Sequence, residues 1–324
     1  DGLALINGTQ AMSARAITCL NECMFLAQLA NISASLSLIA LNAHRGPFDE
    51  KIHQLKPHRG QILTAKIIRE LIKDCEIKNS KSRVQDPYSL RCIPQVHGAS
   101  IDIIEQSKKI ILNEINSVTD NPLIFYPKKD GEDIEIISGG NFHGQYLAFT
   151  LDHLGMAMAE LANISERRIE LLLNPAHSNG LPPFLIEKSG LNSGFMMMHV
   201  TASALVNENK ILSHPASTDS IPTSANREDH VSMGMTSANK LKTIIENSKW
   251  VLAIEFLASC QALDLRKNLI LNPTINSLHK KFRETVAHAT SDRVFHYDID
   301  AIREMIRDDS IKLCIQKTVG ELEC

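Results

Sequence analysis

Apolar side chains recur along this chain in alternating steps of three and four residues. Two such series are Phe25, Leu29, Ile32, Leu36 and Ile39, and Leu147, Leu151, Leu154, Met158 and Leu161. Steps of this kind place all members of a series on one face of an α-helix. The pattern therefore predicts two long helices that pack nearly parallel to their neighbours.

A third long segment, residues 231–265, is apolar on most of its sides, with Glu255 as an exception. Because a helix that is apolar all round is normally buried, this segment is expected at the centre of the fold. Chain breakers separate the apolar segments into about seven or eight helices. The breakers fall at residues 45–47, 78–82, 120–122, 128–131, 180–183 and 221–222.

One short β-hairpin is expected in the middle of the chain. Residues 123–126 (Leu-Ile-Phe-Tyr) and 134–137 (Ile-Glu-Ile-Ile) favour strands, and the turn sequence Lys-Lys-Asp-Gly at 128–131 lies between them. Aromatic residues make up only 5% of the chain, which argues against a larger sheet. We therefore predict an all-α fold, an elongated bundle of long near-parallel helices with a small β-hairpin, as a single helical domain over residues 1–324.

The composition is typical of a globular protein, with 44% hydrophobic and 22% charged residues. The 34 Lys and Arg residues are balanced by 37 Asp and Glu residues, so the net charge is −3 and no basic field exists to attract nucleic acid or an anionic membrane. The most apolar stretches expected from the sequence, 146–162 and 251–263, are interrupted by charges before they reach the roughly 18 residues of a membrane span. Neither nucleic acid nor a membrane is an expected partner, and small neutral or zwitterionic ligands remain open.

The seven cysteines form no C-x-x-C pair. An odd number in a chain of this length indicates reduced thiols in a cytoplasmic protein. Cys19 and Cys23 lie four residues apart in an apolar helical pattern, so a packing role is expected rather than metal binding. The chain also lacks the nucleotide-binding motif G-x-G-x-x-G, a Walker loop and the zinc motif H-E-x-x-H, so neither a nucleotide nor a metal is expected.

Polar, glycine-containing clusters lie at the expected helix ends, where a rigid bundle can hold a site. The first is Asn-Gly-Thr-Gln at residues 7–10. Thr9 is a candidate N-cap and Gly8 a turn residue, whereas Asn7 could donate to and accept from a polar ligand. A structural role and a ligand role both remain open for this cluster.

The second cluster, residues 83–92, contains two arginines, a tyrosine, an amide and a carboxylate around Pro87. Arg91 could hold a carboxylate through two parallel N–H bonds, as binding of an amino acid requires. An Arg–Asp pair within the loop is the structural alternative.

The third cluster is Ser-Gly-Gly-Asn-Phe-His at 138–143. The glycines before Phe142 allow either close approach to a ligand or a turn after the hairpin.

The longest polar run, residues 217–230, leads into the apolar segment at 231–265. Glu228 and Asp229 are expected in the first turn of that helix, where the macrodipole stabilises a carboxylate by about 0.3–1 kcal/mol. Capping explains one carboxylate but not Glu228, Asp229 and His230 together. These residues are therefore candidates for an acid, a base or a substrate anchor.

Taken in order, these clusters resemble the motifs of the histidine and aromatic amino-acid ammonia-lyases, and the histidine-specific members most closely. The matching segments are residues 2–10, 85–91, 119–123, 138–143, 165–168, 180–185, 190–195 and 220–233. They extend over essentially the whole chain. Eight motifs in the same order are not a chance agreement.

The resemblance implies a homotetramer of long helices in which each active site takes residues from three subunits. It implies elimination of ammonia from L-histidine to give trans-urocanate, with a methylidene-imidazolone electrophile that forms from an internal Ala-Ser-Gly. That tripeptide does not occur in this chain, where residues 98–101 read Gly-Ala-Ser-Ile. In the family the tripeptide lies upstream of the Asn-Gly-Thr-Gln segment. The chain is therefore expected to be the downstream portion of such an enzyme and inactive by itself.

The resemblance also assigns roles to residues by position. Asn7 matches the asparagine beside the electrophile, which is expected to hold the electrophile's carbonyl or the substrate amine. Tyr88 and Arg91 match the tyrosine and arginine of the Gln-Asp-x-Tyr-Ser-Leu-Arg motif. Tyr88 is expected to be catalytic, Arg91 to bind the substrate carboxylate, and Gln85 to give polar support in the substrate pocket.

The resemblance assigns roles to two further residues, one in the pocket wall and one beside the substrate ring. Phe142 matches the aromatic residue of the Gly-Gly-Asn-Phe motif, a pocket wall supplied by a neighbouring subunit. Glu228 matches the glutamate that histidine lyases place near the imidazole, where phenylalanine lyases tend to have glutamine. Glu228 therefore supports histidine as the substrate, with a part in both binding and catalysis. Arg227 stands where glutamine or lysine is more usual, a departure at the periphery.

Two alternatives remain open. A phenylalanine or tyrosine ammonia-lyase, or an aminomutase, would share these motifs but would not depend on Glu228. A non-catalytic helical assembly module would keep the subunit contacts without the reaction. Residues 232–240 also show a faint similarity to the signature loop of the fumarase and argininosuccinate lyase group, but this stretch is expected to begin a helix instead.

Overall fold

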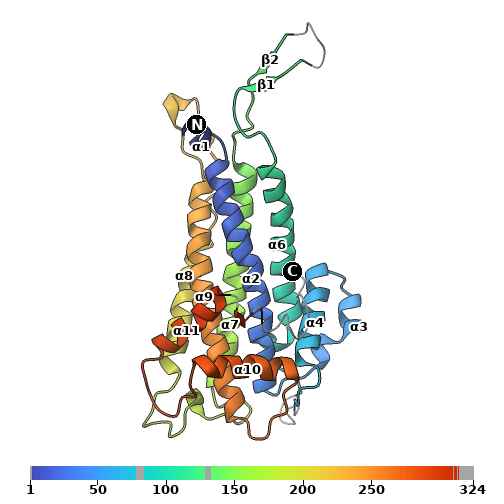
Figure 1. Cartoon of the computed structure of the whole chain (residues 1–324), viewed down its shortest axis with the longest axis vertical. Helices are drawn as coiled ribbons and strands as arrows, with labels where there is room; N and C mark the ends of the chain where they lie inside the picture. The colour runs from blue at the N-terminus through green and yellow to red at the C-terminus, as the bar shows by residue number, and fades with distance from the viewer. Residues whose placement is uncertain (1, 78–83, 128–132, 309, 312, 314–324) are drawn as a thin grey trace.

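The computed structural model describes residues 2–77, 84–127, 133–308, 310, 311 and 313. Five long helices lie side by side along one axis, as predicted from the apolar periodicity (Figure 1). They are α2 (Gln10–Ala40), α6 (Ile93–Ile115), α7 (Gln145–Leu173), α8 (Met196–Leu212) and α9 (Gly234–Leu265). The predicted all-α class and elongated bundle are confirmed.

Helix α9 lies at the centre of the bundle, in contact with α2, α7, α8 and α11 (His296–Arg307). Residues 251–263 of this helix are all buried. A helix without a polar face can fold only when neighbours cover every side, which is why its sequence lacks a simple amphipathic pattern. The central position predicted for this segment is confirmed, although the helix begins at Gly234 rather than at residue 231.

Helix α2 contains the most apolar long window of the described helices. An 18-residue window within it has a mean hydropathy of 1.6, enough in length and composition to cross a membrane, and 83% of that window is buried inside the bundle. The sequence had suggested that 146–162 and 251–263 are the most apolar stretches. That expectation was wrong, because the apolar window lies in α2. Burial against α6, α7 and α9 accounts for the composition of α2.

Shorter helices surround the wider end of the bundle (Figure 1). In the described part of the chain, eight α-helices have twelve or more residues, in agreement with the seven or eight expected. The remaining elements are α1 (Gly2–Ile6), α3 (Glu50–Gln54), α4 (Arg59–Ile72), α5 (Tyr88–Arg91), α10 (Pro273–Thr285) and the 3-10 turns η1 (Gly46–Phe48), η2 (Pro183–Leu185) and η3 (Ser224–Asn226). The predicted breakers at 78–82 and 128–131 lie outside the described residues.

The predicted hairpin forms from β1 (Leu123–Phe125) and β2 (Glu135–Ile137), paired antiparallel with Leu123 opposite Ile137. It projects beyond the narrow end of the bundle (Figure 1). Its apolar side chains stay exposed, including Ile124 at 55% and Ile136 at 66%. Such exposure is unusual for a two-stranded ribbon, which by itself has marginal stability in water.

A buried ionic network joins four helices near the middle of the fold. The guanidinium of Arg168 on α7 donates to both carboxylate oxygens of Glu255 on α9, and neither side chain is exposed. The hydroxyls of Ser37 on α2 and Ser165 on α7 also donate to Glu255, each at 2.7 Å. Burial and the charge of Arg168 hold the pKa of His97, on α6, well below its usual 6.5. The network satisfies Glu255, the buried carboxylate of α9.

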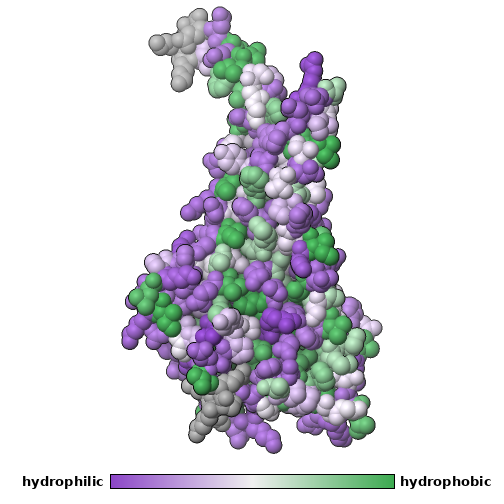
Figure 2. Space-filling model, turned by 180° about the vertical axis from the view of Figure 1, so that it is seen from behind, coloured by the Kyte–Doolittle hydropathy of each residue, from purple (hydrophilic) through white to green (hydrophobic). Residues whose placement is uncertain are grey.

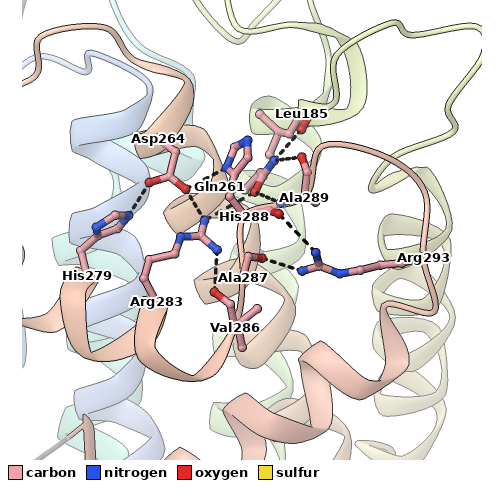
Figure 3. A network of polar contacts seen from close by, with 10 residues as sticks. All are labelled: Leu185, Gln261, Asp264, His279, Arg283, Val286, Ala287, His288, Ala289 and Arg293. Atoms are coloured by element: carbon pink, nitrogen blue, oxygen red, sulfur yellow. Dashed lines mark hydrogen bonds and ion pairs between the residues drawn. The ribbon is translucent and has the colours of Figure 1, made fainter.

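The C-terminal elements attach to the end of α9 through Asp264 (Figure 3). This carboxylate forms an ion pair with Arg283 at 2.5 Å, and its oxygens lie 2.8 Å from His279 Nε2 and 2.9 Å from His288 Nδ1. Nearby, Gln261 donates to the carbonyl oxygen of Ala289 and accepts from its N–H. These contacts tie α10 and the segment that follows it to the central helix.

Polar residues dominate the face opposite that of Figure 1, with separate apolar patches among them (Figure 2).

The five cysteines in the described part of the chain are free, and Cys19 and Cys23 are buried among apolar neighbours, as expected for a packing role. Burial raises the pKa of Cys19 to about 11.

Candidate active site

Three of the predicted site residues, Asn7, Phe142 and Glu228, lie at the narrow end of the bundle. Asn7 is in the turn between α1 and α2, Phe142 between β2 and α7, and Glu228 between α8 and α9. These connecting segments meet at the end that also holds the N-terminus and the hairpin (Figure 1). We call this region the narrow-end cluster.

The side chain of Asn7 is held by a residue 113 positions away. Its amide Nδ2 donates to Asp120 Oδ1 at 2.7 Å, and the same oxygen accepts the N–H of Asn121 at 2.8 Å. Asp120 belongs to the Thr-Asp-Asn-Pro motif, which the sequence matched to a family without giving it a role. The pair links the first turn of the chain to the segment that enters the hairpin.

Gly8 allows this pairing because the two segments approach each other very closely. A Cβ atom at Gly8 would lie 1.9 Å from the carbonyl oxygen of Thr119, which no side chain can occupy. Thr9 takes the predicted N-cap position of α2, but its hydroxyl makes no capping hydrogen bond. The Asn-Gly-Thr turn is therefore shaped by contact with residue 119 more than by capping.

The same segment also holds the loop of Phe142. Asn121 accepts the N–H of Gly139 at 2.7 Å, and Asn141 donates to the carbonyl oxygen of Val118 at 3.2 Å. The ring of Phe142 stays 41% exposed. The sequence left two roles open for this loop, a turn after the hairpin or close approach to a ligand. A loop that turns and leaves Phe142 exposed is compatible with both roles.

Glu228 occupies an exposed turn and not the first turn of a helix, so that expectation was wrong. Its carboxylate accepts from the hydroxyl of Thr223 at 2.7 Å, and the backbones of the two residues pair as an isolated bridge. Helix α9 starts only at Gly234, after Met233 in a left-handed conformation with φ of 55°. The macrodipole therefore cannot explain why Glu228 is present.

Two contacts hold the segment between α8 and α9, which contains Glu228, against its neighbours. His143 Nε2 lies 3.1 Å from the carbonyl oxygen of His230, and the carboxylate of Asp152 accepts the N–H groups of Ala216 and Ser217, each at 2.9 Å. A groove of about 460 Å³ beside α6 is lined in part by Thr119, Asn141 and His143, but not by Asn7, Phe142 or Glu228. The three predicted residues are all exposed at the surface of the chain.

The other three predicted residues, Gln85, Tyr88 and Arg91, lie at the wide end of the bundle, on and just before α5. Arg91 packs over the ring of Tyr88, with its guanidinium carbon 4.7 Å from the ring centroid. Its Nε is buried and has no hydrogen-bond partner among the residues that the structure describes. Gln85 and Tyr88 are exposed. We call these residues the wide-end cluster.

The wide-end cluster is anchored by a contact that the sequence did not predict. The buried carboxylate of Asp86 accepts the backbone N–H of His44 at 2.6 Å and lies 3.0 Å from His44 Nδ1. Among the described residues, Asp86 pairs with His44 and Arg91 stacks on Tyr88, so the Arg–Asp pair considered from the sequence does not form between Arg91 and Asp86. Arg83 lies outside the described residues.

The two clusters are separated by the length of the bundle. Helix α6 runs from just after Arg91 to just before the segment that holds Asp120, and its 23 residues span about 35 Å at 1.5 Å per residue. One chain therefore does not bring Asn7, Arg91 and Glu228 into a common pocket.

The Ser-Glu-Arg-Arg segment at 165–168 is occupied by structural contacts. Arg168 belongs to the buried network around Glu255, and Glu166 accepts hydrogen bonds from Arg167, His199 and Ser203. Burial alone would raise the pKa of Glu166, but these hydrogen bonds outweigh burial and lower it from 4.5 to about 2. Within the described residues, no group of three or more His, Cys, Asp and Glu side chains is placed to hold a metal ion.

An elongated helical bundle with a projecting hairpin and polar loops at both ends defines the class of fold, and comparison with known proteins defines the family. The model of the family "Aromatic amino acid lyase" matches residues 1–284. Because this match covers most of the chain, the chain belongs to the aromatic amino acid lyase family.

Individual relatives agree with this assignment. Histidine ammonia-lyase 1 of Fusobacterium nucleatum is 46% identical over 326 residues, which cover 100% of this chain and 62% of that protein. The structure of histidine ammonia-lyase from Trypanosoma cruzi superposes with a TM-score of 0.90 at 44% identity, over 99% of this chain and 60% of that one. Tyrosine aminomutase from Streptomyces globisporus gives a TM-score of 0.92 at 34% identity, over 99% and 65%. The chain spans about three fifths of the length of the relatives that it matches.

Proposed function

We propose that this chain is the part of a histidine ammonia-lyase that supplies two substrate-binding clusters, and that the complete enzyme eliminates ammonia from L-histidine to give trans-urocanate. The identity of 44–46% to histidine ammonia-lyases over the whole chain supports this reaction. Glu228 supports histidine in particular, because a carboxylate can accept a hydrogen bond from the imidazole N–H and gains nothing from an apolar ring. The single helical domain over residues 1–324 remains part of this proposal.

The observation that carries the proposal is the separation of the clusters. Asn7 and Glu228 lie at one end of the bundle and Arg91 at the other, so a pocket that contains all three requires different copies of the chain. A closed homo-oligomer that brings the narrow end of one copy to the wide end of another provides such a pocket. A homotetramer with sites shared among subunits, as inferred from the resemblance, satisfies this requirement.

The two clusters have side chains suited to different parts of an amino acid. Arg91 can hold the substrate carboxylate through its guanidinium, whose Nε has no partner within the described part of the chain. Tyr88, stacked beside Arg91, places a hydroxyl next to that carboxylate for proton transfer, and Gln85 adds a polar wall. At the narrow end, Asn7 offers an amide to the amine and Glu228 an acceptor to the imidazole.

The reaction requires a group that the chain does not form from its own residues. The β-proton of an amino acid is too weakly acidic for a base alone to remove at neutral pH. A methylidene-imidazolone, formed from an Ala-Ser-Gly in another segment, would make the amine a better leaving group. Asn7 fits beside such a group because its amide is exposed and already oriented. The binding energy of Arg91 and Asn7 would hold the reacting carbon in place, so that little freedom is lost in the transition state.

A direct test joins this chain to the segment that precedes the matched region in the Fusobacterium nucleatum relative. We call the product the joined protein. The joined protein should produce urocanate from L-histidine, measured by ultraviolet absorbance, and this chain alone should produce none. Turnover by the purified chain alone would contradict the proposal that the electrophile comes from another segment.

In the joined protein, Glu228→Gln should raise the KM for histidine and improve the relative rate with phenylalanine.

A second test uses the separation of the clusters. Arg91→Ala and Asn7→Ala should each abolish most activity of the joined protein. When the two inactive variants are mixed, unfolded and refolded together, some pockets receive an intact Arg91 from one copy and an intact Asn7 from another. Activity should return in the mixture but not in either variant treated alone. Failure of the mixture, with tetramers shown by light scattering, would contradict a shared pocket.

Each of the two alternative functions predicts a different experimental result. Similarity to a tyrosine aminomutase at 34% identity makes an aminomutase or a phenylalanine or tyrosine lyase the second candidate. A joined protein that prefers phenylalanine or tyrosine, and loses nothing on Glu228→Gln, would support it. A non-catalytic assembly module would form oligomers in size-exclusion chromatography but show no histidine binding in calorimetry.

A further inference from the structure

The narrow-end cluster contains a polar pair whose orientation is fixed by chemistry. Asn7 Nδ2 lies 2.7 Å from Asp120 Oδ1. A carboxylate oxygen can only accept a hydrogen bond, whereas an amide has one donating and one accepting end. The nitrogen of Asn7 must therefore face Asp120, and its oxygen must face away from it.

The position of Asp120 is itself fixed by its own segment. Its Oδ1 accepts the N–H of Asn121, and the carbonyl oxygen of the preceding Thr119 lies against Gly8. Asn121 in turn holds the loop of Gly139. The carboxylate thus belongs to a backbone segment that is tied at two points, so it can set the orientation of Asn7 rather than follow it.

We infer that Asp120 is a positioning residue, which turns the amide oxygen of Asn7 outward as a hydrogen-bond acceptor for the amino group of the substrate. The inference rests on the proposed function and refines it. The sequence left open whether Asn7 holds the carbonyl of the electrophile, which needs a donor, or the substrate amine, which needs an acceptor. One amide N–H is occupied by Asp120, so the outward oxygen favours the amine. Asp120 touches neither the substrate nor the reacting atoms.

Asp120→Asn is the informative substitution because it keeps shape and removes polarity. An asparagine at 120 can donate or accept, so the amide of Asn7 can take either orientation. In the joined protein, kcat for histidine should fall by roughly tenfold, with a smaller change in KM, because the lost contact forms to the amine that departs in the reaction. Asp120→Glu, which keeps an acceptor, should recover part of the rate.

A double-mutant cycle separates positioning from a general structural role. If Asp120 acts through Asn7, then Asp120→Asn should have no further effect on kcat in the Asn7→Ala background. Losses that multiply in the double variant, or an unchanged kcat in Asp120→Asn, would overturn the inference. The matched control is Asp49→Asn, whose carboxylate accepts the N–H of Lys51 at 2.9 Å as the N-cap of α3. This control should keep the parental kcat and KM.

A measurement on the chain alone makes the inference independent of the reaction. With nitrogen-15 labelling of asparagine, Asn7→Ala identifies the side-chain amide signal of Asn7. That signal should move on Asp120→Asn and stay in place on Asp49→Asn. An inactive joined protein with the shift present would refute the proposed function and leave the orientation standing. An active joined protein in which the signal does not move would refute the role of Asp120.

Discussion

Arg168 Nε lies 2.5 Å from Glu255 Oε1, and both side chains are completely buried between α7 and α9. The hydroxyls of Ser37 and Ser165 satisfy the remaining lone pairs of the carboxylate. A buried ion pair of this kind recovers its desolvation cost only when every polar atom has a partner. The pair therefore connects the stability of the bundle to the exact register of its helices.

Glu255→Gln should lower the free energy of unfolding by about 3–5 kcal/mol, because it leaves the charge of Arg168 buried without a counter-ion. Urea unfolding followed by circular dichroism measures this change. The joint substitution Arg168→Met with Glu255→Leu should cost less than Glu255→Gln alone. As a control, Glu284→Gln in the exposed pair with Lys281 should change stability by less than about 0.5 kcal/mol. A smaller loss for Glu255→Gln than for Glu284→Gln would contradict the prediction.

The lowered pKa of Glu166 predicts a pH dependence of stability. Hydrogen bonds from His199, Arg167 and Ser203 overcome the effect of burial and lower the pKa from 4.5 to about 2. The folded state therefore binds this proton more weakly than the unfolded state does. The stabilisation, about 3 kcal/mol, is complete above pH 4.5 and is lost as pH falls toward 2. Glu166→Gln should remove it.

The measurement compares urea unfolding of the parent and Glu166→Gln at pH 6 and at pH 3.5. The difference in stability should be larger at pH 6, because the carboxylate of the parent is then ionised in both folded and unfolded states. Glu304→Gln, at an exposed pair with Arg307, serves as the control and should show little difference at either pH. An equal effect of Glu166→Gln at both pH values would be evidence against the predicted shift.

Gly8→Ala should separate the turn that precedes α2 from Thr119. The new Cβ would lie 1.9 Å from the carbonyl oxygen of Thr119, so one backbone segment must move. We expect a loss of about 1–3 kcal/mol in unfolding free energy. The Asn7–Asp120 hydrogen bond should be lost as well, which the amide signal of Asn7 would report. Gly2→Ala, where no atom lies within 4 Å of the new Cβ, should leave both quantities unchanged.

Asp264→Asn should loosen α10 from the bundle. The carboxylate pairs with His279, His288 and Arg283, and these contacts outweigh burial to lower the pKa of Asp264 from its usual 3.8. The stabilisation is therefore present above about pH 3.8 and declines as pH falls below it. At pH 7 the variant should show roughly tenfold faster amide exchange in α10, measured by hydrogen–deuterium exchange.

The matched control is Asp300→Asn, whose carboxylate pairs with His296 and Arg303 at the surface. Amide exchange in α10 should stay at the parental rate in this variant. Exchange in α2 should remain slow in both variants, because the Asp264 contacts fix only the C-terminal elements. Uniformly faster exchange throughout Asp264→Asn would show that the cluster supports the whole fold instead.

The sequence predicted the elements whose information is local. The apolar steps in α2 and α7 are properties of a helix face, and the hairpin follows from two β-prone runs with a turn sequence between them. The start of α9 was missed because Met233 adopts a left-handed conformation, which no periodicity reveals. Glu228 was consequently assigned to a helical turn that does not contain it.

The candidate site was predictable only as a set of residue types. The contacts that position it join residues far apart in the chain, as Asp86 to His44 and Asn7 to Asp120 do. Neither partner has a pattern that identifies the other. The division into two clusters depends on the direction of α6, so it required the three-dimensional arrangement.

The second half of α2 has no side that faces water. Every residue from 31 to 41 is buried, including the polar side chains Asn31, Ser33, Ser35 and Ser37. This run should be the least tolerant stretch in a saturation library selected for soluble expression, because a larger residue collides and a smaller one leaves a void. The loop around Glu228 should accept many substitutions in the same library. Selection for folding and selection for catalysis would thus act on different parts of the chain, and the library could measure the two effects separately.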